Sequence, residues 1–216
     1  IEGQGGKIEC NAEVEEILVE KGEVRGVRLA DGRTLHSDLV VSNADAAWTY
    51  RHMIKPEHRK RWTDRKIDRS HFSNGLFVWY FGTEGKYPDV PHHSVILGPR
   101  YKGLLDDIFK RKVLADDFSL YLHRPTETDP SLAPEGCDTF YALAPVPHLD
   151  ANVDWTTYAE TFKERICQRL EETMLPGLRD RIVTSRLLTP QDFHDRLNSV
   201  KGAAFGYEPR ITQSAW

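Results

Sequence analysis

The sequence has 216 residues, enough for one large domain or for a domain together with part of another. Lys and Arg number 29 against 33 Asp and Glu, which gives a formal net charge of −4. Such a chain has no general attraction to nucleic-acid phosphates, so we expect no nucleic-acid partner. No apolar run approaches the roughly 18 residues of a membrane-spanning helix, and no signal peptide is recognisable.

The cysteines and the chain ends give two further expectations. Cys10, Cys137 and Cys167 lie far apart and form no CxxC pair, so we expect three buried free thiols rather than a disulfide framework. The chain begins with Ile1 and ends at Trp216 without a polar tail, which predicts a segment of a longer protein. Motifs missing from the segment then say nothing against the function of the whole.

The first part of the chain is dominated by predicted short strands. They are expected at residues 7–10, 14–20, 24–29, 34–36 and, as a short strand inside a buried sheet, 39–41. Lys21-Gly22 predicts a turn, and Asp31-Gly32 predicts a type I′ turn because both residue types tolerate positive φ. Asn43 is expected to cap a helix over 44–54, and residues 55–72 predict solvated helix and loop.

The second part alternates strands and helices at irregular spacing. Strands are expected at 74–82, 94–97, 118–123, 138–144 and 182–188, and helices at 99–111, at 156–174 and from Pro190 onward. This order predicts an α+β fold, with a mixed or antiparallel sheet that carries helices on one face. We expect a domain boundary between residues 45 and 46.

Glycines near the start of the chain suggest a nucleotide-binding loop at first sight. Gly3, Gly5 and Gly6 are close together, but the GxGxxG fingerprint would need glycine where Ile8 stands, and it should follow a strand. A glycine with positive φ that ends a helix before Lys7 explains the pattern better.

The histidine pair His92-His93 raises the question of a metal ion. Adjacent side chains on an extended chain point to opposite sides, and no Cys or carboxylate pair nearby completes a ligand set. We therefore expect a solvated loop and no metal site.

Two surfaces are candidates for apolar or membrane contacts. Residues 59–66 combine five basic side chains with Trp62, which predicts a solvated helix face or, alternatively, contact with an anionic membrane. In the strand at 74–82, Phe77, Trp79 and Phe81 share one face. Residue type favours plain core for these three, with the lining of a long apolar substrate site as the alternative.

Seven short segments carry a further signal. They are Gly98-Pro-Arg-Tyr101, Asp117-Phe-Ser-Leu-Tyr-Leu-His123, Ser131-Leu-Ala-Pro-Glu-Gly-Cys137, Leu143-Ala-Pro-Val-Pro-His-Leu149, Met174-Leu-Pro-Gly-Leu178, Thr189-Pro190 with Asp192-Phe193, and Gln213-Ser-Ala-Trp216. In this order, and over nearly the whole chain, they resemble the bacterial phytoene desaturases, a carotenoid desaturase family among the amine-oxidase-like FAD flavoproteins.

The resemblance implies that different parts of the chain bind the cofactor and the substrate. Residues 1–45 would be a small β-rich part of an FAD-binding domain, in which the backbone of Val14 holds the adenine end of FAD. Residues 46–216 would be the substrate-binding domain, with a return to the FAD domain near 203–216. The glycine-rich flavin motifs of the family are absent from the sequence, so we expect this segment neither to retain FAD nor to turn over.

The resemblance also implies a function for the parent enzyme. That function is stepwise, FAD-dependent dehydrogenation of phytoene toward neurosporene or lycopene, with Phe77, Trp79, Phe81 and Phe205 in the wall of a channel for the long apolar carotenoid. We expect peripheral membrane attachment on the cytoplasmic side. The alternatives are a carotene isomerase or another carotenoid oxidoreductase on the same scaffold, or a non-catalytic module that binds apolar ligands or membranes.

Overall fold

The computed structural model describes residues 1–214, so Ala215 and Trp216, which end the last of the seven segments, lie outside the described residues. The chain divides into two compact units, Ile1–His71 and Phe72–Trp216. The expected boundary between residues 45 and 46 separates an FAD-binding part from a substrate-binding part, and it stays a prediction. By packing alone, residues 46–71 belong with the first unit.

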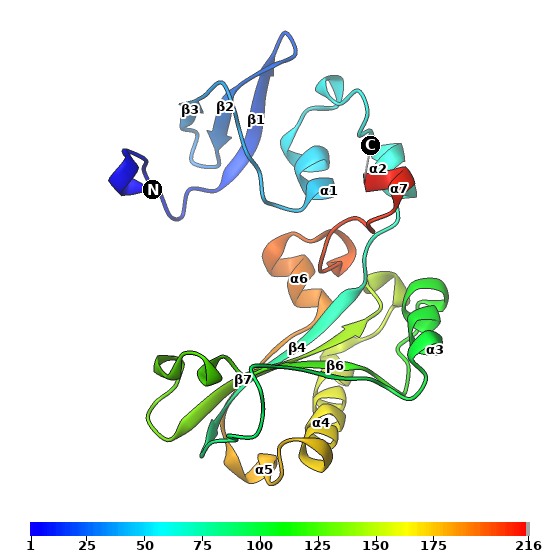
Figure 1. The fold of residues 1–216 in the computed structure, drawn as a ribbon. Coiled ribbons are helices and arrows are strands. Elements are labelled where there is room, and N and C mark those ends of the chain that lie inside the picture. Colours follow the sequence, from blue (N-terminus) through cyan, green and yellow to red (C-terminus); the bar gives the residue numbers. More distant parts are fainter. Residues whose placement is uncertain (215–216) are drawn as a thin grey trace. The chain divides into compact units, whose positions relative to one another are not determined.

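The first unit contains a three-stranded antiparallel sheet (Figure 1). Its strands, in spatial order, are β1 (Val14–Glu20), β2 (Glu23–Leu29) and β3 (Thr34–His36). Lys21 and Gly22 both have positive φ and connect β1 to β2, as a type I′ turn requires. At the next turn only Gly32 has positive φ. The expected type I′ turn at Asp31-Gly32 is wrong, because Leu29 N–H bonds to the Arg33 carbonyl at 2.8 Å and closes a longer loop.

The remaining segments of the first unit are short helices and loops. They are η1 (Glu2–Gln4), α1 (Ala46–Trp48) continuing into the π-helix η2 (Thr49–Met53), η3 (Pro56–His58) and α2 (Asp64–Arg69). Gly5, with φ of 81°, ends η1, which confirms the helix-terminating role expected there. The cap of α1 is Asp45, whose carboxylate accepts from Trp48 N–H at 2.9 Å, so the prediction of Asn43 as cap is wrong.

Two predicted strands do not form. Residues 7–10 and 39–41 are irregular, and Leu39 and Val41 are 74% and 85% exposed. A strand needs hydrogen-bonded neighbours, and in the part of the chain that the structure describes these segments find none. The expectation of three buried thiols is also wrong, since Cys10 is exposed and only Cys167 is buried.

The second unit is built on a five-stranded antiparallel sheet, which confirms the predicted α+β fold. Its spatial order is β5 (His93–Ile96), β6 (Leu120–His123), β7 (Cys137–Val146), β4 (Gly75–Glu84) and β8 (Ile182–Leu188). The α-helices are α3 (Tyr101–Asp106), continuing into the π-helix η4 (Asp107–Arg111), α4 (Trp155–Thr173), α5 (Leu178–Arg181), α6 (Pro190–Leu197) and α7 (Ile211–Ser214). Short 3₁₀ turns are η5 (Pro125–Glu127), η6 (Pro130–Leu132), η7 (Leu149–Ala151) and η8 (Val200–Gly202).

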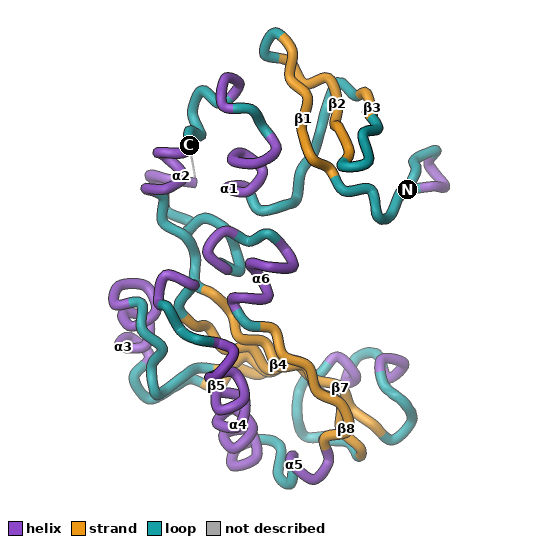
Figure 2. The backbone as a smooth tube through the Cα atoms, turned by 180° about the vertical axis from the view of Figure 1, so that it is seen from behind, coloured by secondary structure: helices purple, strands orange, loops and turns teal. Residues whose placement is uncertain are grey.

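Helix α4 packs along one face of this sheet and forms the core with it (Figure 2). The apolar stripe of the helix buries Phe162, Ile166 and Leu170 against the sheet. Phe162 meets Phe77 edge-on, with ring centroids 5.0 Å apart. One covered face agrees with the prediction of helices on one side of the sheet. No helix among residues 1–214 combines the length and apolarity that crossing a membrane requires.

Candidate functional site

The sheet face opposite α4 is the candidate site, and strand register assembles it. Because paired residues of antiparallel strands share a face, one row across the sheet brings together side chains from all five strands. The row consists of Arg186, Tyr80, Tyr141, His123 and His93. The five strands place its ends about 19 Å apart, at about 4.8 Å per strand spacing.

A second, more apolar row lies beside the first. It consists of Leu188, Val78, Leu143, Tyr121 and Val95. We call the two rows together the open face. Tyr80 is 42% exposed and Val95 is 68% exposed, whereas Val78 is buried. Large apolar and aromatic groups therefore remain accessible toward β5, on a surface where such groups usually indicate a binding partner.

Aromatic rings of the open face touch one another in a continuous series. The Tyr141 ring centroid lies 5.7 Å from that of Tyr80, 5.8 Å from that of Tyr121 and 4.7 Å from that of His123. Burial, followed by hydrogen bonding with Tyr121, raises the pKa of Tyr141 to about 12. Burial, with the nearby His92 and His93, lowers the pKa of His123. The Tyr141 hydroxyl is therefore uncharged at neutral pH, and burial favours the neutral form of the His123 ring, which suits an apolar ligand.

The aromatic residues predicted from sequence lie elsewhere. Phe77, Trp79 and Phe81 occupy the opposite face of β4, beneath α4, and are 0%, 1% and 2% exposed. Phe205 is 68% exposed, and its N–H donates to Ser73 Oγ at 3.0 Å, just before β4. Substrate contact by all four stays a prediction. In this structure only Phe205 among them offers accessible surface.

Val14, the predicted FAD contact, is the first residue of β1 and lies opposite Leu29. Strand β1 is at the edge of its sheet, and Val14 is half-buried. An edge strand can offer backbone N–H and C=O groups to a ligand, so this position fits the adenine contact that was expected. FAD binding there stays a prediction.

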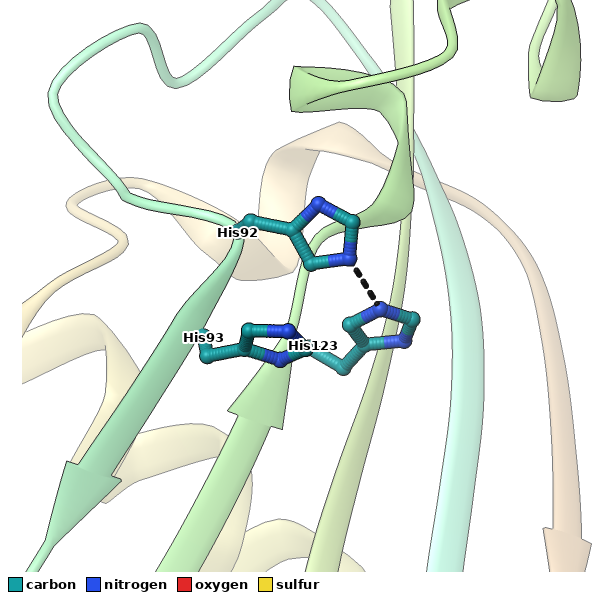
Figure 3. A group of neighbouring side chains, drawn as sticks. All are labelled: His92, His93 and His123. Carbon is teal, nitrogen blue, oxygen red and sulfur yellow. Dashed lines mark hydrogen bonds between the residues drawn. The ribbon is translucent and has the colours of Figure 1, made fainter.

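Three histidines meet at one end of the open face (Figure 3). His93 begins β5 and pairs with His123 at the end of β6, while His92 stands in a bend just before the strand. The rings of His92 and His93 lie 4.3 Å apart, on the same side. Opposite directions for these two side chains would require extended backbone at both positions, and the bend at His92 does not provide it. Sequence reasoning missed His123, although one predicted strand began at Ser94 and another ended at His123.

The basic segment 59–66 is less uniformly basic than its sequence suggests. Arg59 is buried and donates to the exposed Asp64 carboxylate at 2.6 Å, so an acidic partner offsets its charge. The ammonium of Lys66 lies 4.4 Å from the centroid of the Trp62 ring. Membrane contact by this segment stays a prediction.

Comparison with known proteins places this geometry in context. The model of the flavin-containing amine oxidoreductase family matches residues 2–216. A neurosporene-forming phytoene desaturase of Cereibacter sphaeroides is 55% identical over 100% of this chain and 42% of that protein. A lycopene-forming phytoene desaturase of Pseudescherichia vulneris is 51% identical over 98% of this chain and 43% of that protein. The chain thus spans less than half the length of these relatives.

A solved structure supports the fold independently. An oxidoreductase from Methanosarcina mazei matches with a TM-score of 0.58 and 23% identity, over 87% of this chain and 39% of that one.

Proposed function

The chain belongs to the flavin-containing amine oxidoreductase family, and from this premise we propose that the whole protein is an FAD-dependent phytoene desaturase. The observation that carries the proposal is 55% identity to one such enzyme along the entire chain. Three relatives whose product is known divide into two neurosporene-forming enzymes, at 55% and 50% identity, and one lycopene-forming enzyme at 51%. Sequence identity therefore supports phytoene desaturation, and the test has to distinguish neurosporene from lycopene as the end product.

Product analysis in cells that make phytoene tests the proposal. Expression of the full-length protein should convert phytoene into more conjugated carotenes, which chromatography with absorbance detection separates by the number of conjugated double bonds. A carotene isomerase would change retention without adding double bonds. A non-catalytic module would leave phytoene as it is. Either of these last two results would contradict the proposal.

The proposed roles of this chain follow from its two units. FAD, when bound, accepts the hydride that leaves an allylic carbon of the substrate. In the first unit, the backbone N–H and C=O of Val14 would hold the adenine end. In the second unit, the open face would hold part of the polyene against uncharged aromatic rings and exclude water from it. Support comes from the exposure of Tyr80 and Val95 and from the neutral state of Tyr141.

We expect the 216-residue segment by itself not to retain FAD. Its one proposed contact is a backbone pair on an edge strand, without the helix N-terminus that usually binds a pyrophosphate. Titration of the purified segment with FAD, followed by flavin fluorescence, should show no saturation in the micromolar range. Tight, stoichiometric quenching would contradict this expectation.

A phytoene desaturase takes its substrate from membranes, and we propose α3 with η4 as the element that contacts the bilayer, on the cytoplasmic side. Three exposed apolar side chains recur every fourth residue along this element: Tyr101, Leu105 and Phe109, with exposed fractions of 49%, 36% and 41%. This spacing puts them on one side of the helix, and Lys102 and Lys110 are exposed on the same element. Such an amphipathic helix lies at the surface of a membrane.

Vesicle sedimentation separates this element from the basic segment 59–66. The double variant Leu105→Ser/Phe109→Ser should bind vesicles of phosphatidylcholine and phosphatidylglycerol at least about 10-fold more weakly, because two apolar side chains no longer enter the bilayer. The matched control Lys60→Ser/Arg65→Ser should change binding less. If only the control variant lost binding, the basic segment would be the contact instead.

A further inference from the structure

We propose that His92, His93 and His123 bind one divalent transition-metal ion, for which Zn²⁺ is the reference. One ring nitrogen from each histidine lies within 4.8 Å of the others (Figure 3). Zn–N bonds of about 2.0–2.1 Å in a tetrahedral site put ligand nitrogens about 3.3 Å apart. The Nε2 atoms of His92 and His123 are now 2.6 Å apart, so small ring rotations would reach that geometry. The inference is independent of the proposed desaturase activity.

The backbone brings the three rings together before any metal arrives. Antiparallel pairing of β5 with β6 places His93 opposite His123. The N–H of Arg124 donates to the His92 carbonyl at 2.9 Å and fixes the bend that precedes β5. His92 therefore joins the same side as His93 instead of the opposite side. The pairing of β5 with β6 already holds His123 beside His92 and His93, about 30 residues away in the chain, and this lowers the entropy cost of assembling the site.

Outer contacts orient two of the rings as they do in known metal sites. His92 Nδ1 lies 2.5 Å from Thr128 Oγ1, and His93 Nδ1 lies 2.5 Å from the Tyr121 hydroxyl. Each contact engages Nδ1 and leaves Nε2 available, which is the arrangement that fixes the tautomer of a ligating histidine. His123 Nδ1 is buried and has no hydrogen-bond partner among the described residues, so no outer contact of this kind orients the third ring.

The donor set selects the class of metal. Imidazole nitrogens suit Zn²⁺, Co²⁺, Ni²⁺ and Cu²⁺, whereas Mg²⁺ and Ca²⁺ require oxygen ligands, and the described group contains no carboxylate. Three protein ligands leave a coordination position for water. His93 is exposed, so the metal would exchange with solvent rather than remain locked in the fold. The bound ion would fasten the start of β5 to the end of β6, at the border of the open face.

Metal titration of the full-length protein, without a polyhistidine tag and in imidazole-free buffer, tests the proposal. Zn²⁺ alone should bind one ion per chain by calorimetry, and Co²⁺ should give the visible absorption of a tetrahedral complex. His123→Ala should weaken Zn²⁺ binding at least about 100-fold. Tyr121→Phe, which removes only the outer hydroxyl, should weaken it about 10-fold.

His36→Ala is the matched control, because His36 is an exposed histidine in the other compact unit. It should bind Zn²⁺ like the unaltered protein. Circular dichroism of the metal-free variants checks folding, and His93→Gln, at an exposed position, carries the same test if His123→Ala unfolds. The proposal is overturned if the unaltered protein binds Zn²⁺ no more tightly than these ligand variants, or if His36→Ala loses as much affinity as they do.

Discussion

Replacing Phe77 by alanine is expected to lower the free energy of unfolding by about 3–5 kcal/mol, because a fully buried aromatic side chain leaves a cavity under α4. Its ring meets Phe162 at 5.0 Å and Trp155 at 5.7 Å, so both neighbours lose packing as well. Tyr80→Ala, three residues along the same strand, should cost only about 1 kcal/mol, because Tyr80 is 42% exposed. Urea unfolding of both variants, followed by tryptophan fluorescence, measures the difference.

The same pair of variants identifies which face of β4 meets the substrate. If the open face holds the polyene, Tyr80→Ala should raise the apparent KM for phytoene while the protein stays folded. Phe77→Ala should lose activity only in proportion to the protein that unfolds. A folded Phe77→Ala variant with a specific loss of substrate affinity would instead support the channel lining predicted from sequence.

The contrast between these two residues shows how far sequence reasoning reaches. Alternation of large apolar residues correctly predicts a strand at β4 and correctly divides its residues into two faces. It does not say which face a helix covers, because that depends on α4, whose apolar stripe begins almost 80 residues later in the chain. The covered face therefore had to come from the structure.

Local signals predicted the helices and several strands well. Strand β8 spans residues 182–188 as predicted, and Thr189 with Asp192 forms a capping box at the start of α6. Such elements are set by patterns within a few residues of each other. The site depends on pairing between distant segments, such as His93 with His123. The predicted strands at 7–10 and 39–41 fail for a similar reason, since an apolar run becomes a strand only beside a partner.

Asp138→Ala is expected to have the largest effect of any polar substitution in the second unit, a loss of about 3–5 kcal/mol of stability. The carboxylate is 1% exposed and accepts from Tyr87 N–H and from the Thr126 hydroxyl, each at 2.8 Å. It also forms an ion pair with Arg124 Nε at 3.1 Å. Removing the carboxylate leaves the Tyr87 N–H without its acceptor and the buried Arg124 guanidinium without its ion-pair partner on β7. The exposed Glu127, which lies beside Arg124 Nη1, offsets the second loss only in part.

Thr126→Val provides the matched control, because it deletes one hydrogen bond to the same carboxylate and keeps the shape of the side chain. It should cost about 1 kcal/mol. Thermal and urea unfolding of these two variants and of the double variant Arg124→Met/Asp138→Leu then separate the effect of the unpaired Arg124 charge from that of the lost hydrogen bonds. The double variant should be more stable than Asp138→Ala, because no unpaired charge remains buried. If Asp138→Ala and Thr126→Val lost equal amounts of stability, water or Glu127 would already balance the charge of Arg124. The ion pair of Arg124 with Asp138 would then not hold β7 against the loop that precedes β5.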